Sequence, residues 1–529
     1  EISSSDWSSD VCSSDLSKIT RAQLSSEHAT ITFLVWSQYH RLYNRSLRVE
    51  HSLGDGYYCT DSKKEMISEE MIKAVSNAVK EILKGDTKIE FVSLEREKLI
   101  EKFQKMNLDD KVGVLKTWQD EFIPCVKCGE FIDYTFETMS TDKERLKLFE
   151  IRKYAEGLVI RFPTLLQPEV LSEWKDPSAL LGMFNEYNEW AKLLRVDDVA
   201  RLNKYIYKRK IDDVKWVAEG LHDKKLSKIA EYLVNNFDKK RVVTIAGPSS
   251  SNKTTFAKRL AIALRVCGYK STVIEMDDYY KNRADIPFGP DGLQDFEHIS
   301  AINVDLLSQR VAMLLRGESI PKHKFDFQSG LGIDCKTEMI TLKPKSFLIL
   351  EGIHGLNPYL LEKFGRDIVT PIYVSALTPL NIDSNHRFPT SDLRLIRRMI
   401  RDYRYRGYSP RKTLARWTSV RMGEERNIFP YQQNAELFFN SALVYELPVL
   451  SIYGKSLLSE ATIPEPDENP ESQQSKDISA EARRLLGMLN LFYPVSLEVV
   501  PHISCIREFV GGSDRSEERR VGKECRSRW

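Results

Sequence analysis

The sequence has few cysteines and no long apolar run. Its 529 residues include 8 cysteines, which are scattered without the spacing of a disulfide framework, so we expect free thiols. No apolar stretch approaches the length of a membrane-spanning helix, and the first 16 residues lack the basic and apolar regions of a secretion signal. These absences favour a cytoplasmic protein without a membrane anchor.

An excess of one charge is also lacking. The 78 Lys and Arg residues nearly balance the 76 Asp and Glu residues, which leaves a net charge of +2. This balance gives no overall argument for binding to nucleic acid or to a membrane. A hydrophobic content of 42% is ordinary for a globular protein, and the length suffices for roughly two to four domains.

Both ends look foreign to the rest of the chain. Residues 1–16 and 515–529 resemble translated sequencing-library adapter, and residues 13–16 and 515–518 can be encoded by reverse-complementary strings. We therefore predict that neither segment contributes to the fold. Between them the sequence texture predicts four parts: a first domain over 17–195, a helical connector over 196–240, a second domain over 241–455 and an extension over 456–514.

Residues 242–255 carry the strongest functional signal. An apolar run leads into a loop of small residues and then into a helix pattern, and the loop fits G-x-x-x-x-G-K-[ST] except at its second glycine, which is Asn252. Such a loop turns its backbone N–H groups toward a polyphosphate, while Lys253 reaches the phosphates and the Thr254 hydroxyl binds Mg²⁺. Asn tolerates the left-handed conformation at a cost of about 1 kcal/mol. The expected ATP-binding residues are Gly247, Pro248, Ser249, Ser250, Ser251, Asn252, Lys253, Thr254 and Thr255.

Apolar strands alternate with helices from 241 to about 454. The strand patterns lie at 242–246, 272–275, 347–350, 368–374 and 443–452. This alternation predicts an α/β fold with a parallel sheet covered by helices on both faces. Asp277 and Glu351 follow two of these strands, and both would face the phosphate loop because ligands bind beyond the carboxyl ends of such strands.

A helix predicted over 394–407 is rich in arginine. Arg394, Arg397, Arg398 and Arg401 crowd one broad face, which is more positive charge than a helix gains from. Guanidinium groups in this density suit closure over a transferring γ-phosphate. An exposed basic helix or an RNA-binding surface is the alternative.

Taken in order, the phosphate loop, the segments 277–281, 295–298 and 350–353, and the arginine-rich helix resemble the uridine kinase branch of the phosphoribulokinase/uridine kinase superfamily. The resemblance covers about 240–450 and implies a kinase that uses ATP and Mg²⁺. It implies Lys253 on the phosphates, Thr254 and Glu351 around Mg²⁺, and Asp277 beside the metal as the base for a sugar 5′-hydroxyl. It further places Tyr280, Glu297 and Phe325 at the acceptor and Arg398, Arg401 and Arg406 in the lid.

Two departures concern the acceptor. Residues 324–330 have Phe325 in place of the family's Tyr and lack the His that reads the pyrimidine, and a second lid arginine is Tyr408 here. We therefore expect a nucleoside kinase whose base preference is open. The alternatives are a kinase for another hydroxylated small molecule, or an RNA-linked P-loop NTPase or binding module.

Residues 28–162 resemble the editing-type accessory domain of threonyl-tRNA synthetases through the segments 54–58, 94–97 and 128–133. The family's His-x-x-x-His and Cys-x-x-x-His motifs are here 28–32 and 135–139, and only His28 keeps its identity. The resemblance implies an α+β domain kept for binding or assembly, without editing activity. RNA contact through this domain and self-association of the chain are further hypotheses.

Overall fold

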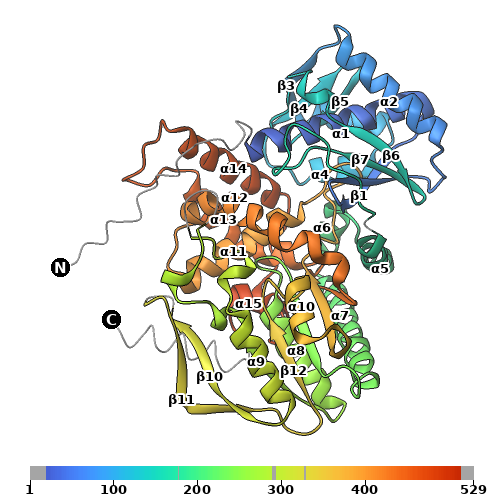
Figure 1. The fold of residues 1–529 in the computed structure, drawn as a ribbon. Coiled ribbons are helices and arrows are strands. Elements are labelled where there is room, and N and C mark those ends of the chain that lie inside the picture. The colour runs from blue at the N-terminus through green and yellow to red at the C-terminus, as the bar shows by residue number, and fades with distance from the viewer. Residues whose placement is uncertain (1–19, 177, 289–293, 327–328, 514–529) are drawn as a thin grey trace.

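The computed structural model describes residues 20–176, 178–288, 294–326 and 329–513. The segments predicted to derive from adapter lie outside these ranges. An N-terminal α+β part sits above a larger α/β part, and helices from the C-terminal third lie between and beside them (Figure 1). In the part of the chain that the structure describes, no helix combines the length and apolarity needed to span a bilayer.

The N-terminal part consists of two antiparallel sheets and a long helix. Helix α1 (Arg21–Tyr43) begins after Thr20, whose hydroxyl accepts the Gln23 N–H and so caps the helix. One sheet has the order β1-β2-β7-β6 and the other β3-β4-β5. The bounds are β1 (Leu47–Leu53), β2 (Gly56–Asp61), α2 (Glu69–Lys84), β3 (Ile89–Glu95), α3 (Arg96–Lys105), α4 (Asp109–Leu115), β4 (Phe122–Cys128), β5 (Phe131–Tyr134), β6 (Glu150–Tyr154) and β7 (Gly157–Arg161).

Three helices lead from this part to the second one. They are α5 (Ser178–Leu194), α6 (Val199–Tyr207) and α7 (Ile211–Asn235).

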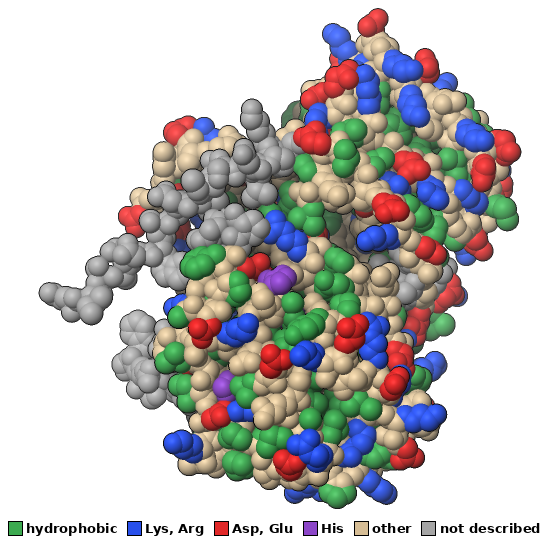
Figure 2. Space-filling view, in the orientation of Figure 1, with side chains coloured by type: hydrophobic (Ala, Val, Ile, Leu, Met, Phe, Trp, Pro, Cys, Tyr) green, Lys and Arg blue, Asp and Glu red, His purple; other side chains and the backbone are tan. Residues whose placement is uncertain are grey.

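Acidic and basic side chains are mixed over the face of the N-terminal part that Figure 2 shows, without a continuous stripe of one sign.

The second part contains a five-stranded parallel sheet with the order β14-β13-β8-β12-β9. Alternate residues face opposite sides: Val243 packs with α7 and α8, whereas Val242 packs with α9 and α10. Helices therefore cover both faces, and the predicted α/β class is confirmed. The bounds are β8 (Val242–Ala246), α8 (Lys253–Val266), β9 (Lys270–Glu275), α9 (Val304–Leu315), β12 (Ser346–Glu351), α10 (Pro358–Phe364), β13 (Val369–Ser375) and β14 (Leu437–Asn440).

The prediction of a strand at 443–452 was wrong. The last strand of the sheet is β14, and the chain then turns into helix α13 (Glu446–Ala461). A short apolar run does not distinguish a buried strand from a buried helix. Pro448 stands in the first turn of α13, where the missing N–H costs no helical hydrogen bond.

The remaining elements surround the carboxyl end of the sheet. They are the hairpin β10 (Ser319–Asp326) and β11 (Leu331–Thr341), and the helices α11 (Thr390–Arg406), α12 (Pro410–Asn427), α14 (Gln473–Asn490) and α15 (Arg507–Val510). A single hydrophobic cluster joins α1 and the N-terminal sheets to α11, α13 and α14. The N-terminal part is thus packed against the helix that contains the predicted lid arginines.

Candidate active site

The phosphate loop runs between β8 and α8, as its pattern predicts. A Cβ on Gly247 would lie 2.1 Å from the Val374 carbonyl oxygen, so this position requires glycine. Ser250 and Asn252 adopt the left-handed conformation with φ of 59° and 67°. Asn is among the residues that tolerate this geometry best, and the loop keeps its shape without the second glycine.

The Asn252 side chain is held by three partners. Its Nδ2 donates to the Cys505 carbonyl oxygen (3.0 Å) and to Glu508 Oε2 (2.9 Å), and its Oδ1 accepts from Arg397 Nη1 (2.7 Å). Glu508 also accepts from the Thr255 hydroxyl. The residue that replaces glycine therefore links the phosphate loop to α15 through hydrogen bonds. The two segments lie some 250 residues apart, so the local sequence pattern does not predict this contact.

The first turn of α8 faces the end of β12. Lys253 Nζ donates to the Pro248 carbonyl oxygen (3.2 Å), and the Thr254 hydroxyl donates to Glu351 Oε1 (2.5 Å). Burial raises the pKa of Glu351 to about 7, with Lys253 and the Thr254 hydrogen bond opposing the shift. A hydroxyl and a carboxylate at this distance supply the oxygen ligands that Mg²⁺ prefers.

Asp277 lies just beyond β9, in the short turn Met276–Tyr279. Burial raises its pKa, and the positive charges of Lys253 and Arg406 oppose this rise. The neighbouring Asp278 accepts the backbone N–H of Phe325 in β10 instead. The two adjacent carboxylates therefore have different surroundings, with Asp277 toward the phosphate loop and Asp278 toward the hairpin.

Three arginines of α11 gather on one carboxylate. Arg398, Arg401 and Arg406 lie 3.2, 2.9 and 3.4 Å from the oxygens of Asp402, which leaves their group with an excess of positive charge. Arg398 Nη1 also donates to the Ser249 hydroxyl of the phosphate loop (2.8 Å). Burial and mutual repulsion lower the pKa of both Arg398 and Arg406. We call these three residues the arginine cluster.

Arg394 and Arg397 do not belong to this cluster, contrary to the expectation that one face of the helix is uniformly positive. Both are buried, and each forms a two-pronged pair with a glutamate of another helix, Arg394 with Glu424 and Arg397 with Glu446. Their guanidinium groups also donate to the carbonyl oxygens of Ser249 and Ser250 (both 3.0 Å). They hold the phosphate loop, and the glutamates that neutralise them cannot be inferred from the helix sequence alone.

The residues expected at the acceptor assemble beside Asp277. The Tyr280 hydroxyl donates to the Phe296 carbonyl oxygen (3.2 Å), and its ring lies edge-on to Phe325, with centroids 5.5 Å apart. Desolvation and the negative charges of Glu424 and Asp277 raise the pKa of Glu297 to about 7. The structure thus brings the aromatic, acidic and basic candidates together at the carboxyl end of the sheet.

The described residues contain no group of three His, Cys, Asp or Glu side chains arranged to hold a metal ion. The donors at the phosphate loop, the Thr254 hydroxyl and the Glu351 and Asp277 carboxylates, fit Mg²⁺, which is commonly held by one or two carboxylates together with phosphate oxygens and water.

In the N-terminal part, the surviving motif residue His28 is packed against Phe162, with ring centroids 4.3 Å apart. Its Nε2 lies 3.2 Å from the Pro163 carbonyl oxygen, and burial lowers its pKa to about 4. Thr32, Thr135 and Met139, from the same two motifs, line a cavity instead. The resemblance to the synthetase accessory domain stays a prediction.

The region of the chain that contains this site has known relatives. The model of the phosphoribulokinase / uridine kinase family matches residues 242–447. A uridine kinase of Bacillus pumilus is 32% identical over 179 residues, which are 34% of this chain and 75% of that protein. A uridine kinase of Macrococcus caseolyticus is 28% identical over 201 residues, which are 38% of this chain and 87% of that protein.

Solved structures give weaker likenesses. A putative fructose transport system kinase from Silicibacter sp. TM1040 has a TM-score of 0.29 and 16% identity, covering 40% of this chain and 98% of that one. A possible uridine kinase from Bacillus stearothermophilus has a TM-score of 0.24 and 18% identity, covering 28% of this chain and 79% of that one. On the sequence relatives and the family model, the chain belongs to the phosphoribulokinase / uridine kinase family.

Proposed function

We propose that the protein transfers the γ-phosphoryl group of ATP to the 5′-hydroxyl of a nucleoside, giving a nucleoside monophosphate and ADP. The observation that carries this proposal is the convergence of Lys253, the Thr254–Glu351 pair, Asp277 and the arginine cluster on one end of the sheet. The names of the relatives support a nucleoside as the acceptor.

Each group has a role that its surroundings suit. The phosphate loop and Lys253 hold the polyphosphate, and Thr254 and Glu351 would hold Mg²⁺, which would supply a counter-charge to the transferring group. Asp277 accepts the proton of the attacking hydroxyl, while the arginine cluster compensates the charge that spreads over the phosphoryl oxygens. Asp402 offsets only part of the cluster's charge, so the arginines keep the capacity to bind an anion.

The acceptor side combines flat apolar surface with a carboxylate. Tyr280 and Phe325 provide aromatic edges, and Glu297 provides an acceptor for a hydroxyl or amino group. A nucleoside offers both a flat base and ribose hydroxyls. Another small hydroxylated acceptor, the remaining alternative among kinases, lacks the flat base.

Release of ADP by the full chain, measured with Mg²⁺ and ATP against nucleosides, sugar phosphates and pantothenate, tests the proposal. We expect the fastest release with a nucleoside. Lys253→Ala should abolish turnover, a loss of about 10³-fold or more, because the side chain acts on the transferring group. Lys224→Ala, at an exposed position of α7, serves as the matched control. Near-normal turnover of Lys253→Ala, or ADP release that no acceptor stimulates, would refute the proposal.

A further inference from the structure

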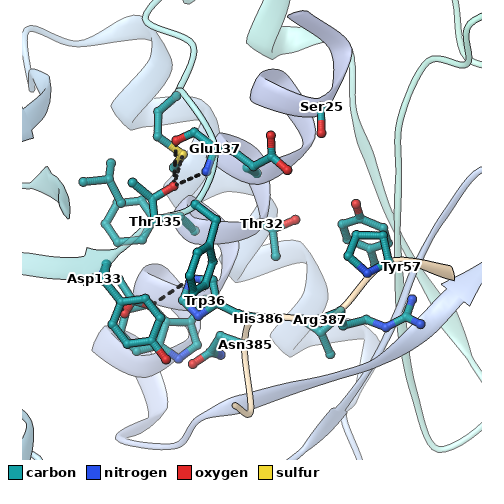
Figure 3. Close-up of a pocket in the computed structure, with 18 of the residues that line it drawn as sticks. Ser25, Thr32, Trp36, Tyr57, Asp133, Thr135, Glu137, Asn385, His386 and Arg387 are labelled. Atoms are coloured by element: carbon teal, nitrogen blue, oxygen red, sulfur yellow. Dashed lines mark hydrogen bonds and ion pairs between the residues drawn. The ribbon is translucent and has the colours of Figure 1, made fainter. Parts of the chain in front are cut away.

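A cavity of about 130 Å³ lies where the N-terminal part meets the second part. One wall comes from α1 and from residues 133–139, and another comes from the segment between β13 and α11, residues 376–389, which we call the junction loop. Figure 3 shows Asn385, His386 and Arg387 of this loop below Thr32 and Trp36 of α1. The cavity is therefore built from both parts of the chain.

The junction loop is firmly anchored. Asp383 accepts the backbone N–H groups of Asn385 and His386 (2.7 and 2.8 Å) and lies 3.3 Å from Lys111 Nζ. Lys111 in turn pairs with Asp133 at 2.8 Å. The wall that faces the cavity is thus held in place by buried polar contacts from the N-terminal part.

Arg387 of the junction loop is incompletely paired. Its Nη1 donates to the Ser52 hydroxyl (2.8 Å), but its Nε and Nη2 are buried and have no hydrogen-bond partner. Within the described ranges, no carboxylate lies at ion-pair distance from it. The Asn385 Oδ1 is likewise buried without a partner. Arg387 therefore lines the cavity as a cation without an ion-pair partner among the described residues.

The other charges on the cavity wall are neutralised. Asp133 pairs with Lys111, and Glu137 pairs with Arg484 at 3.1 Å. The remaining surface is largely apolar, with contributions from Phe33, Trp36, Phe136, Met139 and Met488. The cavity therefore combines one uncompensated positive charge with an apolar chamber.

We propose that this cavity binds a small monocarboxylate with a flat apolar body. The carboxylate pairs with the guanidinium group of Arg387, whose planar shape matches that of a carboxylate. A cavity of about 150 Å³ with apolar walls accommodates a benzene ring, so the slightly smaller volume of about 130 Å³ here limits the apolar body to a single ring. The phosphate loop and the arginine cluster take no part in this site.

The site also connects to the lid, an inference that rests on the proposed function. The junction loop runs directly into α11, and Arg484 bridges the cavity wall to the first turn of α11 through Asp392 (2.7 Å) and Glu137 (3.1 Å). A ligand that contacts Arg387 in the junction loop will therefore bias the position of the arginine cluster. Because such coupling is reciprocal, the carboxylate and ATP should alter each other's affinity.

Binding is tested by calorimetry on the full chain with benzoate, and with benzamide as its neutral counterpart of equal shape. We expect benzoate to bind at least about tenfold more tightly, since hydrogen bonds to a charged group contribute about 1.5–3 kcal/mol. Arg387→Gln should reduce the ratio of benzoate to benzamide affinity to about one, whereas Arg387→Lys should keep part of this preference. The control variant Arg265→Gln, at an exposed position of α8, should keep the full preference. Absence of saturable benzoate binding, or an unchanged ratio in Arg387→Gln, would overturn the site.

Coupling is tested by the dissociation constant of a fluorescent ATP analogue with and without saturating benzoate. A change of about fivefold or more is expected, and it should vanish in Arg387→Gln. An unchanged constant would overturn the link to the lid. Failure of the chain to bind the ATP analogue at all would count against the proposed kinase function, while the preference for benzoate over benzamide would still decide the site.

Discussion

Two clusters of charged side chains in this protein are built on opposite principles. At the junction between the two parts, Lys111, Asp133 and Asp383 have side chains that are 0, 4 and 0% exposed. In the arginine cluster, three guanidinium groups share the single carboxylate of Asp402, and the side chains of Arg398, Arg401 and Arg406 are 17, 18 and 50% exposed. The first cluster is closed and satisfied, and the second is open and under-compensated.

This difference separates charges that hold the structure from charges that can meet a ligand. A buried ion pair adds little net stability, but removal of one partner is strongly destabilising. A group of like charges near solvent is unfavourable by itself and gains when an anion binds. Substitutions should therefore lower stability at the junction and lower activity at the lid and the phosphate loop.

The largest expected difference in turnover within the open site is between variants of its two adjacent aspartates. Asp277→Asn keeps the size of the side chain and removes its charge and basicity, so turnover should fall by about 10²–10⁴-fold while the acceptor still binds. Asp278→Asn should stay within a few-fold of the parent, because Asp278 faces the hairpin. Steady-state kinetics on both variants decide the point. An essential Asp278 and a dispensable Asp277 would reverse the assignment.

The closed cluster should respond in stability. Lys111→Met removes the lysine between Asp133 and Asp383 and leaves His386, 2.9 Å from Asp383, as their remaining basic neighbour. We expect a loss of about 3–5 kcal/mol in the free energy of unfolding. Urea denaturation measures this loss, with Lys116→Met, at an exposed position just after α4, as the control. A loss no larger than that of the control would remove the distinction between the two clusters.

The pH dependence of stability should distinguish the buried carboxylate of Glu351, which has no cationic side chain at ion-pair distance among the described residues, from the carboxylates that form buried ion pairs. The pKa of Glu351 is raised from 4.5 to about 7, so the folded state keeps a proton that the unfolded state has lost. Stability should therefore fall as the pH rises through this window, by about 3 kcal/mol for this group. Unfolding with a chelator present, at about pH 5 and pH 8, should show a smaller fall in Glu351→Gln. Glu460→Gln, at an exposed position of α13, should behave as the parent.

The smallest expected effect is at Asn252. Replacement by glycine relieves left-handed strain of about 1 kcal/mol but removes three hydrogen bonds that link the phosphate loop to Arg397 and α15. We expect a net loss of stability of about 1–3 kcal/mol and ATP affinity at least equal to that of the parent. A double-mutant cycle with Glu508→Ala should give a coupling of about 0.5–3 kcal/mol. Zero coupling would mean that the contact with α15 contributes nothing.

The parallel sheet and the phosphate loop were accessible from the sequence because their signals are local. Residues 242–255 contain the strand, the small-residue loop and the start of the helix in one continuous segment. Strand β14 and helix α13 were misjudged because an apolar run such as 443–452 satisfies either geometry until its neighbours are known. Asp277, Glu351 and the arginines of α11 were proposed as site residues because each follows a strand or lies in a dense motif, and their roles remain predictions.

The sequence by itself determined the α/β class, the position of the phosphate loop and the candidates for phosphoryl transfer, since backbone conformation and short motifs depend on adjacent residues. Only the tertiary structure decided which arginines of α11 are neutralised, that Asn252 is bound by α15, and that Arg387 faces a cavity shared by both parts. These outcomes depend on partners between 30 and 335 residues away. Electrostatic pairing is a property of distance in space, and linear order does not encode that distance.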